Sequence, residues 1–191
     1  MAIGDGSVII ESGAMSANTL SMTAIPQTYS HLELQVTGCY DEASVANDWL
    51  YFKFNGETGT EYGFHGTQSG VGAGLTTNNI ALNSSTATGG ASGSYGAEFP
   101  GTQKSPNPNG VVRWFIMNYA NTTVQKPFIL DYCHVWRPNS TDETARLGNL
   151  VGKYPTTSTS LLTSGISQID VIGAGSYTFK SGTRYMLVGW P

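Results

Sequence analysis

The chain has 191 residues, a net charge of −4 at pH 7, 12% charged residues and 11% aromatic residues. A disordered chain would be rich in charge and poor in aromatic residues, so this composition indicates a folded domain. The acidic balance argues against a nucleic-acid-binding protein. A membrane-spanning helix needs about 20 consecutive apolar residues, whereas the longest comparable run, at 111–117, contains Arg113. We therefore expect neither nucleic acid nor membrane as a partner.

Apolar and polar residues alternate along much of the chain, which is the period of a β-strand, and no long segment shows a helical period. The clearest alternation is at 31–37, where Leu32, Leu34 and Val36 share one face. The run at 49–54 is aromatic on both faces and precedes Asn55-Gly56, which favours a tight turn. In chain order, strands are predicted at 8–11, 19–25, 31–37, 49–54, 61–65, 111–119, 128–136, 147–154, 166–172 and 183–190.

Nine or ten such strands predict an all-β fold, an antiparallel β-sandwich of jelly-roll type, because two packed sheets can bury that many half-apolar strands. The sandwich is predicted to be a single domain over 15–191. A Gly/Ser/Asn-rich excursion at about 66–110 interrupts the pattern. We expect this excursion to be shaped by neighbouring segments or to contact another chain.

Residues 1–14 are expected to form an N-terminal arm, because a few aliphatic residues stand there among small ones. An arm of this kind can add a strand to an exposed sheet edge. We therefore predict that the arm is a docking element for another chain. Its apolar contact residues would be Ile3, Val8, Ile9 and Ile10.

The residues that often bind metals do not show a ligand spacing. Cys39 and Cys133 are too few for a secreted disulfide scaffold and are expected to be free thiols. His134 is adjacent to Cys133, so on a strand the two side chains point to opposite faces. His31 and His65 are equally isolated in the sequence. The glycine-rich stretches also lack the spacing of nucleotide-binding loops, so we expect neither a metal site nor a cofactor.

No nucleophile has a base at a recognisable spacing, so the chain is not expected to be an enzyme. The alternative is polysaccharide cleavage by two carboxylates that the fold brings together. Asp131 lies on an apolar strand face, which indicates either a perturbed acid or a partner for an arginine such as Arg113. The acids that could form a catalytic pair are Asp41, Glu42, Asp48, Glu57, Glu61 and Asp131.

The four tryptophans all lie within predicted strands, where packing in a core or an interface is their usual role. Aromatic side chains can also stack on sugar rings, which leaves a glycan-binding module open as an alternative. The stacking residues in that alternative would be Trp49 and Trp136.

The sequence reads IPQTYSHLEL at 25–34, FKFNGETG at 52–59, NYANTT at 118–123 and GTRYMLVGW at 182–190. Together and in this order, these segments resemble a family of small β-sandwich virion proteins of tailed bacteriophages. Lys53, Glu57, Val188 and Trp190 depart from the residues common in that family.

The resemblance implies a virion structural protein without catalytic residues. It favours a capsid decoration, or cement, protein that binds the major capsid protein on the outside of the phage head. Such a protein would be made in the host bacterial cytoplasm and would assemble as a homotrimer. The alternative within the same family is a tail fibre or a receptor- or glycan-binding module of the tail. Low charge suits a protein fixed in a shell, because mobile charged side chains lose entropy on docking.

Overall fold

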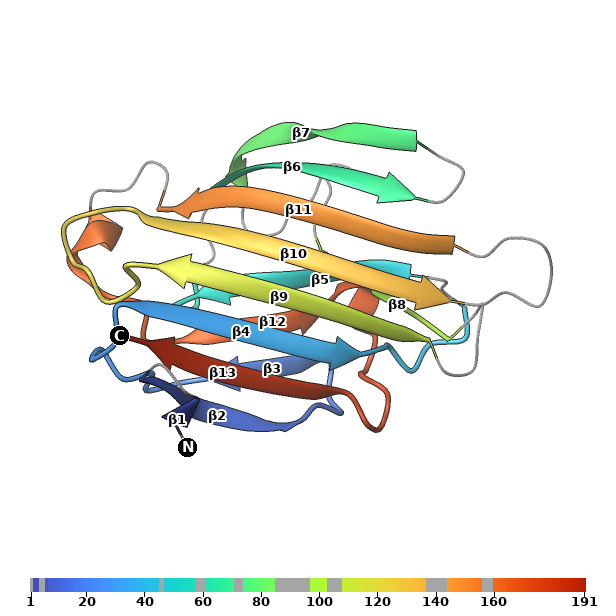
Figure 1. Cartoon of the computed structure of the whole chain (residues 1–191), viewed down its shortest axis with the longest axis horizontal. Coiled ribbons are helices and arrows are strands. Elements are labelled where there is room, and N and C mark those ends of the chain that lie inside the picture. Colours follow the sequence, from blue (N-terminus) through green and yellow to red (C-terminus); the bar gives the residue numbers. More distant parts are fainter. Residues whose placement is uncertain are drawn as a thin grey trace.

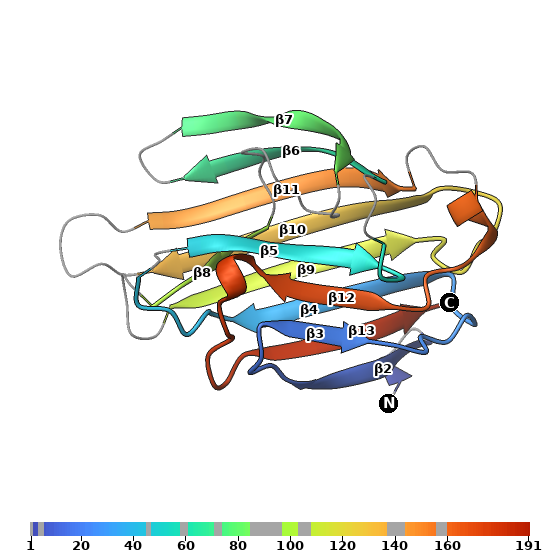
Figure 2. The ribbon, with the colours of Figure 1, turned by 180° about the vertical axis from the view of Figure 1, so that it is seen from behind.

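The computed structural model describes residues 2–3, 6–44, 47–57, 61–70, 74–84, 97–102, 108–136, 144–155 and 160–191. These residues form two antiparallel β-sheets that stack face to face, which confirms the predicted all-β sandwich (Figures 1 and 2). Two short 3-10 helices, η1 (Ser160–Thr163) and η2 (Ala174–Ser176), lie in the connections.

The large sheet has nine strands and the small sheet has four. In spatial order the large sheet contains β1 (Ala2–Ile3), β2 (Ser7–Ala14), β13 (Arg184–Trp190), β4 (His31–Gly38), β9 (Asn109–Met117), β10 (Lys126–Trp136), β11 (Thr144–Tyr154), β6 (Tyr62–Gly70) and β7 (Gly74–Ser84). The small sheet contains β3 (Thr19–Met22), β12 (Ile169–Gly173), β5 (Asn47–Phe54) and β8 (Ala97–Pro100). The excursion expected at 66–110 therefore includes the end of β6, all of β7 and all of β8.

Aromatic side chains from both sheets meet in the core. The Trp114 ring of β9 lies 4.1 Å from the Phe52 ring and stacks at 5.0 Å on the Phe54 ring, and both phenylalanines belong to β5. Phe128 of β10 meets Trp114 edge to face at 5.6 Å. All four side chains are buried. The aromatic face predicted for residues 49–54 thus joins the small sheet to the large one.

Two glycines of β11 make room for aromatic rings of β10. Gly148 lies opposite Tyr132, and Gly152 lies opposite Phe128. A Cβ atom on either glycine would overlap the facing ring. Aromatic rings that cover a cross-strand glycine stabilise antiparallel sheets, because the ring shields backbone that would otherwise be uncovered.

Gly148→Ala should lower the free energy of unfolding by about 1–3 kcal/mol, because the new methyl group overpacks against the Tyr132 ring. In a Tyr132→Leu background, the same substitution should be neutral or stabilising, because alanine also restricts the unfolded chain. Urea unfolding of the four proteins measures both effects. An equal cost of Gly148→Ala in the two backgrounds would contradict the ring–glycine contact.

The segment expected to be an N-terminal arm lies instead within the sandwich. β2 pairs with β13 from Ala14 opposite Arg184 to Val8 opposite Gly189. Ile10 packs against the hydrophobic core. Of the aliphatic residues that suggested an external contact, Val8, Ile9 and Ile10 are thus half-buried in a strand that pairs with the chain's own last strand.

Deleting residues 1–6 should leave the stability of the sandwich almost unchanged, because it removes β1 but keeps β2. Deleting residues 1–12 should cost roughly 3 kcal/mol, since burial of three half-buried aliphatic side chains is lost at about 1 kcal/mol each. Thermal unfolding of both truncated proteins provides the comparison. If the two truncated proteins had equal melting temperatures, this segment would be better interpreted as a separate arm.

One end of the sandwich is closed by hydrogen bonds to the segment 164–168, at the end of the molecule where the C-terminus lies (Figure 1). The Asn55 side-chain amide donates to the Gly165 carbonyl at 3.0 Å, and its oxygen accepts from the Ser167 N–H at 2.8 Å. Gln27 donates to the Ile166 carbonyl at 2.9 Å, and the Tyr119 carbonyl accepts from the Ile166 N–H at 2.8 Å. Three loops that are distant in sequence therefore meet at one segment.

Candidate functional site

The face of the large sheet that points away from the small sheet is called the outer face, and Figure 1 looks onto it. Five polar side chains cross this face in a single row, one from each of five adjacent strands. The strand register places these side chains side by side in the order Gln35, Arg113, Asp131, Asn149 and Thr67. Neighbouring strands lie about 4.8 Å apart, so this polar row spans roughly 20 Å.

Exposed aliphatic side chains flank the polar row on both sides. Val111 and Leu147 lie on one side and are 41% and 54% exposed, while Val151 lies on the other side and is 48% exposed. Val135 is further along β10 and is 54% exposed. Of the large hydrophobic side chains that are exposed among the described residues, only Val124 lies outside this face.

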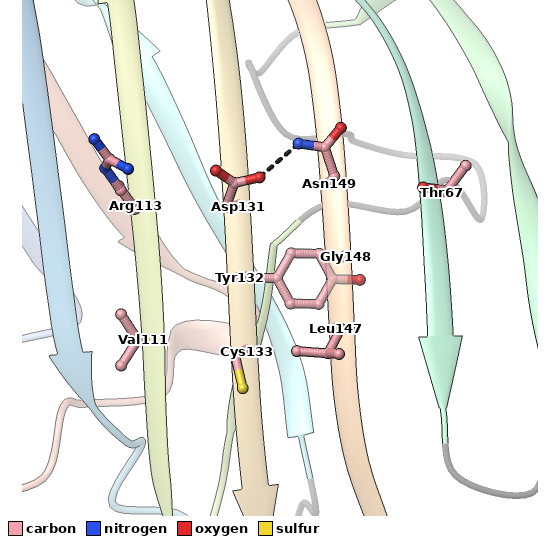
Figure 3. Close-up of a pocket in the computed structure, with 9 residues that line it drawn as sticks. All are labelled: Thr67, Val111, Arg113, Asp131, Tyr132, Cys133, Leu147, Gly148 and Asn149. Atoms are coloured by element: carbon pink, nitrogen blue, oxygen red, sulfur yellow. Dashed lines mark hydrogen bonds between the residues drawn. The ribbon is translucent and has the colours of Figure 1, made fainter.

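A shallow depression of about 500 Å³ lies over the polar row and the side chains on one side of it (Figure 3). Tyr132 and the half-buried Cys133 are also among the residues that line it. Binding sites are typically concave surfaces in which mainly apolar side chains surround a few polar groups. The outer face is therefore the described surface that is best suited to bind a partner.

A buried carboxylate lies beside the polar row on the same face of the sheet. Arg113 donates from Nε and Nη2 to the two carboxylate oxygens of Glu33, at 2.6 and 3.2 Å. The Glu33 side chain is 4% exposed, whereas that of Arg113 is 52% exposed. Burial by itself raises the pKa of Glu33, but the hydrogen bonds from Arg113 and Gln35 outweigh it, and the pKa lies below its ordinary value.

Asp131 is therefore not the main partner of Arg113, although the two are neighbours in the register. Its carboxylate accepts a 2.5 Å hydrogen bond from Asn149 on the next strand and remains exposed. The sequence pattern predicts an arginine such as Arg113 as a partner of Asp131, whereas the structure shows the two only as register neighbours. The pattern did not indicate the Glu33–Arg113 pair, because that pair depends on the register between two strands about 80 residues apart.

Glu33→Gln should lower the free energy of unfolding at neutral pH by about 1 kcal/mol, because the Arg113 side chain that pairs with Glu33 is half exposed and solvent screens the ion pair. The pKa of Glu33 is lower in the folded than in the unfolded chain, so its stabilisation is present above the unfolded value. This stabilisation disappears as the pH falls through the folded value. Urea unfolding at a series of pH values should therefore show the gap between the two proteins closing in acid. A gap that does not change with pH would exclude this ion pair.

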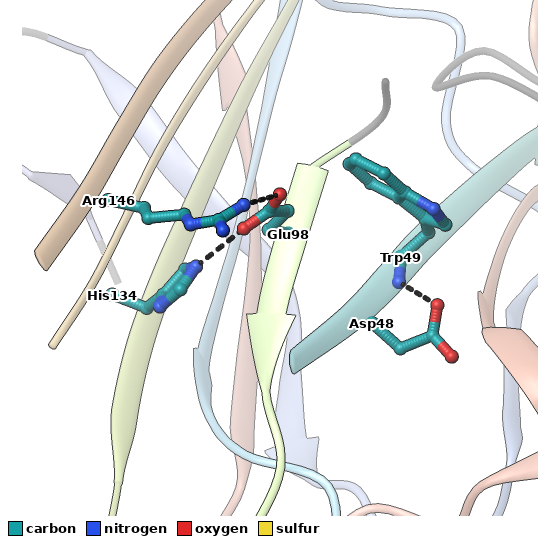
Figure 4. A network of polar contacts seen from close by, with 5 residues as sticks. All are labelled: Asp48, Trp49, Glu98, His134 and Arg146. Carbon is teal, nitrogen blue, oxygen red and sulfur yellow. Dashed lines mark hydrogen bonds and ion pairs between the residues drawn. The ribbon is translucent and has the colours of Figure 1, made fainter. Parts of the chain in front are cut away.

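A second polar cluster is buried between the sheets (Figure 4). The Glu98 carboxylate of β8 lies 3.1 Å from His134 Nε2 and accepts a 2.5 Å hydrogen bond from Arg146 Nη1. The side chains of Glu98 and His134 are 3% and 0% exposed, whereas that of Arg146 is 37% exposed. Trp49 lies opposite Glu98 in the β5–β8 register, and the backbone N–H of Trp49 donates to the Asp48 carboxylate. The cluster links β8 of the small sheet to β10 and β11 of the large sheet.

The residues predicted to contact sugar or another chain lie apart from the outer face depression. Val8 and Ile9 are half-buried in β2, and Ile3 belongs to β1, whose side chains are not described. Trp49 is half-buried in the small sheet, while Trp136 ends β10 of the large sheet and its side chain lies outside the described residues. The two tryptophans therefore come from different sheets.

The acids named as possible catalytic pairs are distributed over several parts of the chain. Burial, followed by the charges of Glu57 and Glu61, raises the pKa of Tyr154 to about 12, so these two acids lie near one tyrosine. Glu42 accepts a hydrogen bond from the Ser44 N–H.

Cys39 is buried, Cys133 is half-buried, and both are free thiols. Burial raises the pKa of the Cys39 thiol. The three histidines belong to three different strands, β4, β6 and β10. Across the described ranges, no group of three His, Cys, Asp or Glu side chains could hold a metal ion. The same ranges contain no helix that is long and apolar enough to span a membrane.

No protein-family model and no curated protein matches this sequence. Among solved structures, the marine PL-14 alginate lyase from Aplysia kurodai is 9% identical, with a TM-score of 0.27 over 87% of this chain and 72% of that chain. Two infectious bursal disease virus structures, of the Gx strain and of a VP2 subviral particle, are 11% and 10% identical, with TM-scores of 0.11 and 0.12. They cover 96% and 97% of this chain, which spans 38% and 35% of theirs. Likenesses of this strength establish neither a shared fold nor a shared activity.

Proposed function

We propose that this chain is a virion structural protein of a tailed bacteriophage, and specifically a decoration protein that binds the major capsid protein on the outside of the head. The observation that carries the proposal is the gathering of exposed aliphatic side chains on one sheet face. Large exposed apolar patches mark surfaces that proteins bury against partners. The resemblance of four sequence segments to virion proteins supports a phage virion as the assembly to which this face attaches.

The physical character of the outer face suits permanent attachment to a shell. Its exposed apolar residues are valines and a leucine, which lose less side-chain entropy on burial than lysine or glutamate would. They are carried on paired strands of a large sheet, so the backbone needs no further ordering when a partner binds. The proposal gives the chain no catalytic role, metal or cofactor.

A tail-associated receptor- or glycan-binding module is the second candidate. The polar row favours it, because amide, carboxylate and guanidinium groups can form hydrogen bonds with sugar hydroxyls. The two candidates differ in the number of copies that a virion must contain. A decoration protein covers a lattice, whereas a tail module occurs in a few copies at one vertex.

The copy number of the protein in purified virions should approach that of the major capsid protein. Quantitative gel staining or mass spectrometry of intact particles, and of separated heads and tails, provides the measurement. A head fraction that lacks the protein would overturn the decoration proposal. A few copies confined to the tail fraction would support the receptor-binding alternative.

A further inference from the structure

We propose that the outer face binds one extended segment of the major capsid protein, and that this segment lies along β9 and β10. Three side chains of the segment point at the face. The two outer ones are apolar, and the middle one carries an amide. The inference rests on the proposed decoration function, because it takes the capsid protein as the partner, and it names the chemistry that this partner must present.

Two depressions lie over β9 and β10. The larger one is the depression of about 500 Å³ over the polar row, and Leu147 belongs to its apolar lining (Figure 3). The smaller one has a volume of about 200 Å³, and its apolar lining consists of Phe115 and Ile129. Arg113 and Asp131 line both depressions. These two residues therefore form a charged ridge between two apolar hollows.

The spacing of the two depressions matches an extended chain. Along β9, Val111 lines the larger depression, Arg113 belongs to the ridge and Phe115 lines the smaller depression. Residues two apart on a strand are about 6.6 Å apart, so the depressions lie about 13 Å from each other. Positions i, i+2 and i+4 of a second extended chain point to one side with the same spacing. Positions i, i+4 and i+8 of a helix turn by about 40° at each step, so a helix cannot place all three on this line.

The charged ridge selects a group that both donates and accepts hydrogen bonds. Arg113 uses two N–H donors on Glu33, whereas a guanidinium has five. The exposed Asp131 carboxylate accepts one hydrogen bond from Asn149, and a carboxylate can accept several. The amide of an asparagine or glutamine accepts from the guanidinium through its oxygen and donates to the carboxylate through its nitrogen. A single carboxylate or ammonium in this position would be repelled by one of the two charges.

The unequal sizes of the depressions determine the direction of the segment. The smaller depression is below the roughly 300 Å³ at which pockets for small molecules begin, so it suits a single aliphatic side chain. The larger depression has room for an aromatic ring. Leu147 beside the larger depression and Val151 beside the smaller one are 54% and 48% exposed in the isolated chain. Docking of the segment removes both side chains from water, which favours binding.

Cosedimentation of the full chain with shells assembled from the major capsid protein alone tests the two depressions and the ridge. Ile129→Trp fills the smaller depression and should weaken binding at least about tenfold, because it displaces an apolar side chain of the segment. Val124→Trp is the matched control, since Val124 is 43% exposed but lies outside the outer face, and it should bind like the wild type. Asp131→Ala should also weaken binding about tenfold, because the amide loses a charged acceptor.

Photo-cross-linking tests the extended geometry with variants that leave both depressions open. Leu147→photo-leucine and Ile129→photo-leucine introduce a diazirine with little change in side-chain size, and each should cross-link to the shells on irradiation. Peptide mapping should place the two cross-linked capsid residues about four positions apart in one stretch of sequence, since this is the strand spacing that joins the depressions. Val124→photo-leucine should give no cross-link in that stretch.

The outcomes distinguish failure of this inference from failure of the decoration role. A wild-type chain that does not bind the shells would overturn both. If the wild type binds and Ile129→Trp binds equally well, the decoration role stands and the docked segment is excluded. Cross-links from positions 147 and 129 to two separate stretches of the capsid sequence would also exclude a single segment and leave the decoration role intact.

Discussion

The contact of Trp114 with Phe52 and Phe54 is the interaction on which the rest of the structure depends. It brings one aromatic residue of the large sheet between two from the small sheet, and all three are buried. Because side chains alternate along a strand, fixing Trp114 inward fixes Arg113 and Phe115 outward. A shift of β9 by one residue would bury Arg113 and expose the tryptophan. Core packing therefore determines which residues the outer face can present.

The ring–glycine pairs on the inner side have a related consequence for the outer side. Tyr132 and Phe128 lie over glycines of β11, and this arrangement holds β10 and β11 in one register. The same register sets Asp131 beside Asn149. The polar row is thus a by-product of inner-face packing in neighbouring strands. Its geometry is rigid for that reason, which suits recognition of a partner with a fixed surface.

Local patterns were sufficient to predict much of the fold. The alternation at 31–37 correctly placed Leu32, Leu34 and Val36 in the core, and Asn55-Gly56 forms the expected turn with both residues at positive φ. The N-terminal strand was assigned to an arm, because nothing in its own sequence shows that β13 pairs with it. The polar row could not be predicted either, since it exists only through the registers of five strands that are dispersed along the chain.

The segments that resemble phage virion proteins contribute in a specific way to the structure. Gln27, Asn55 and Tyr119 come from three of these segments, and all three hydrogen-bond to the segment 164–168 at one end of the sandwich. None of the polar-row residues lies within the segments that carry the resemblance. Three residues of these segments therefore close the sandwich, whereas other residues form the outer face. The partner must be determined from the outer face, where single substitutions can change binding without disturbing the closed end.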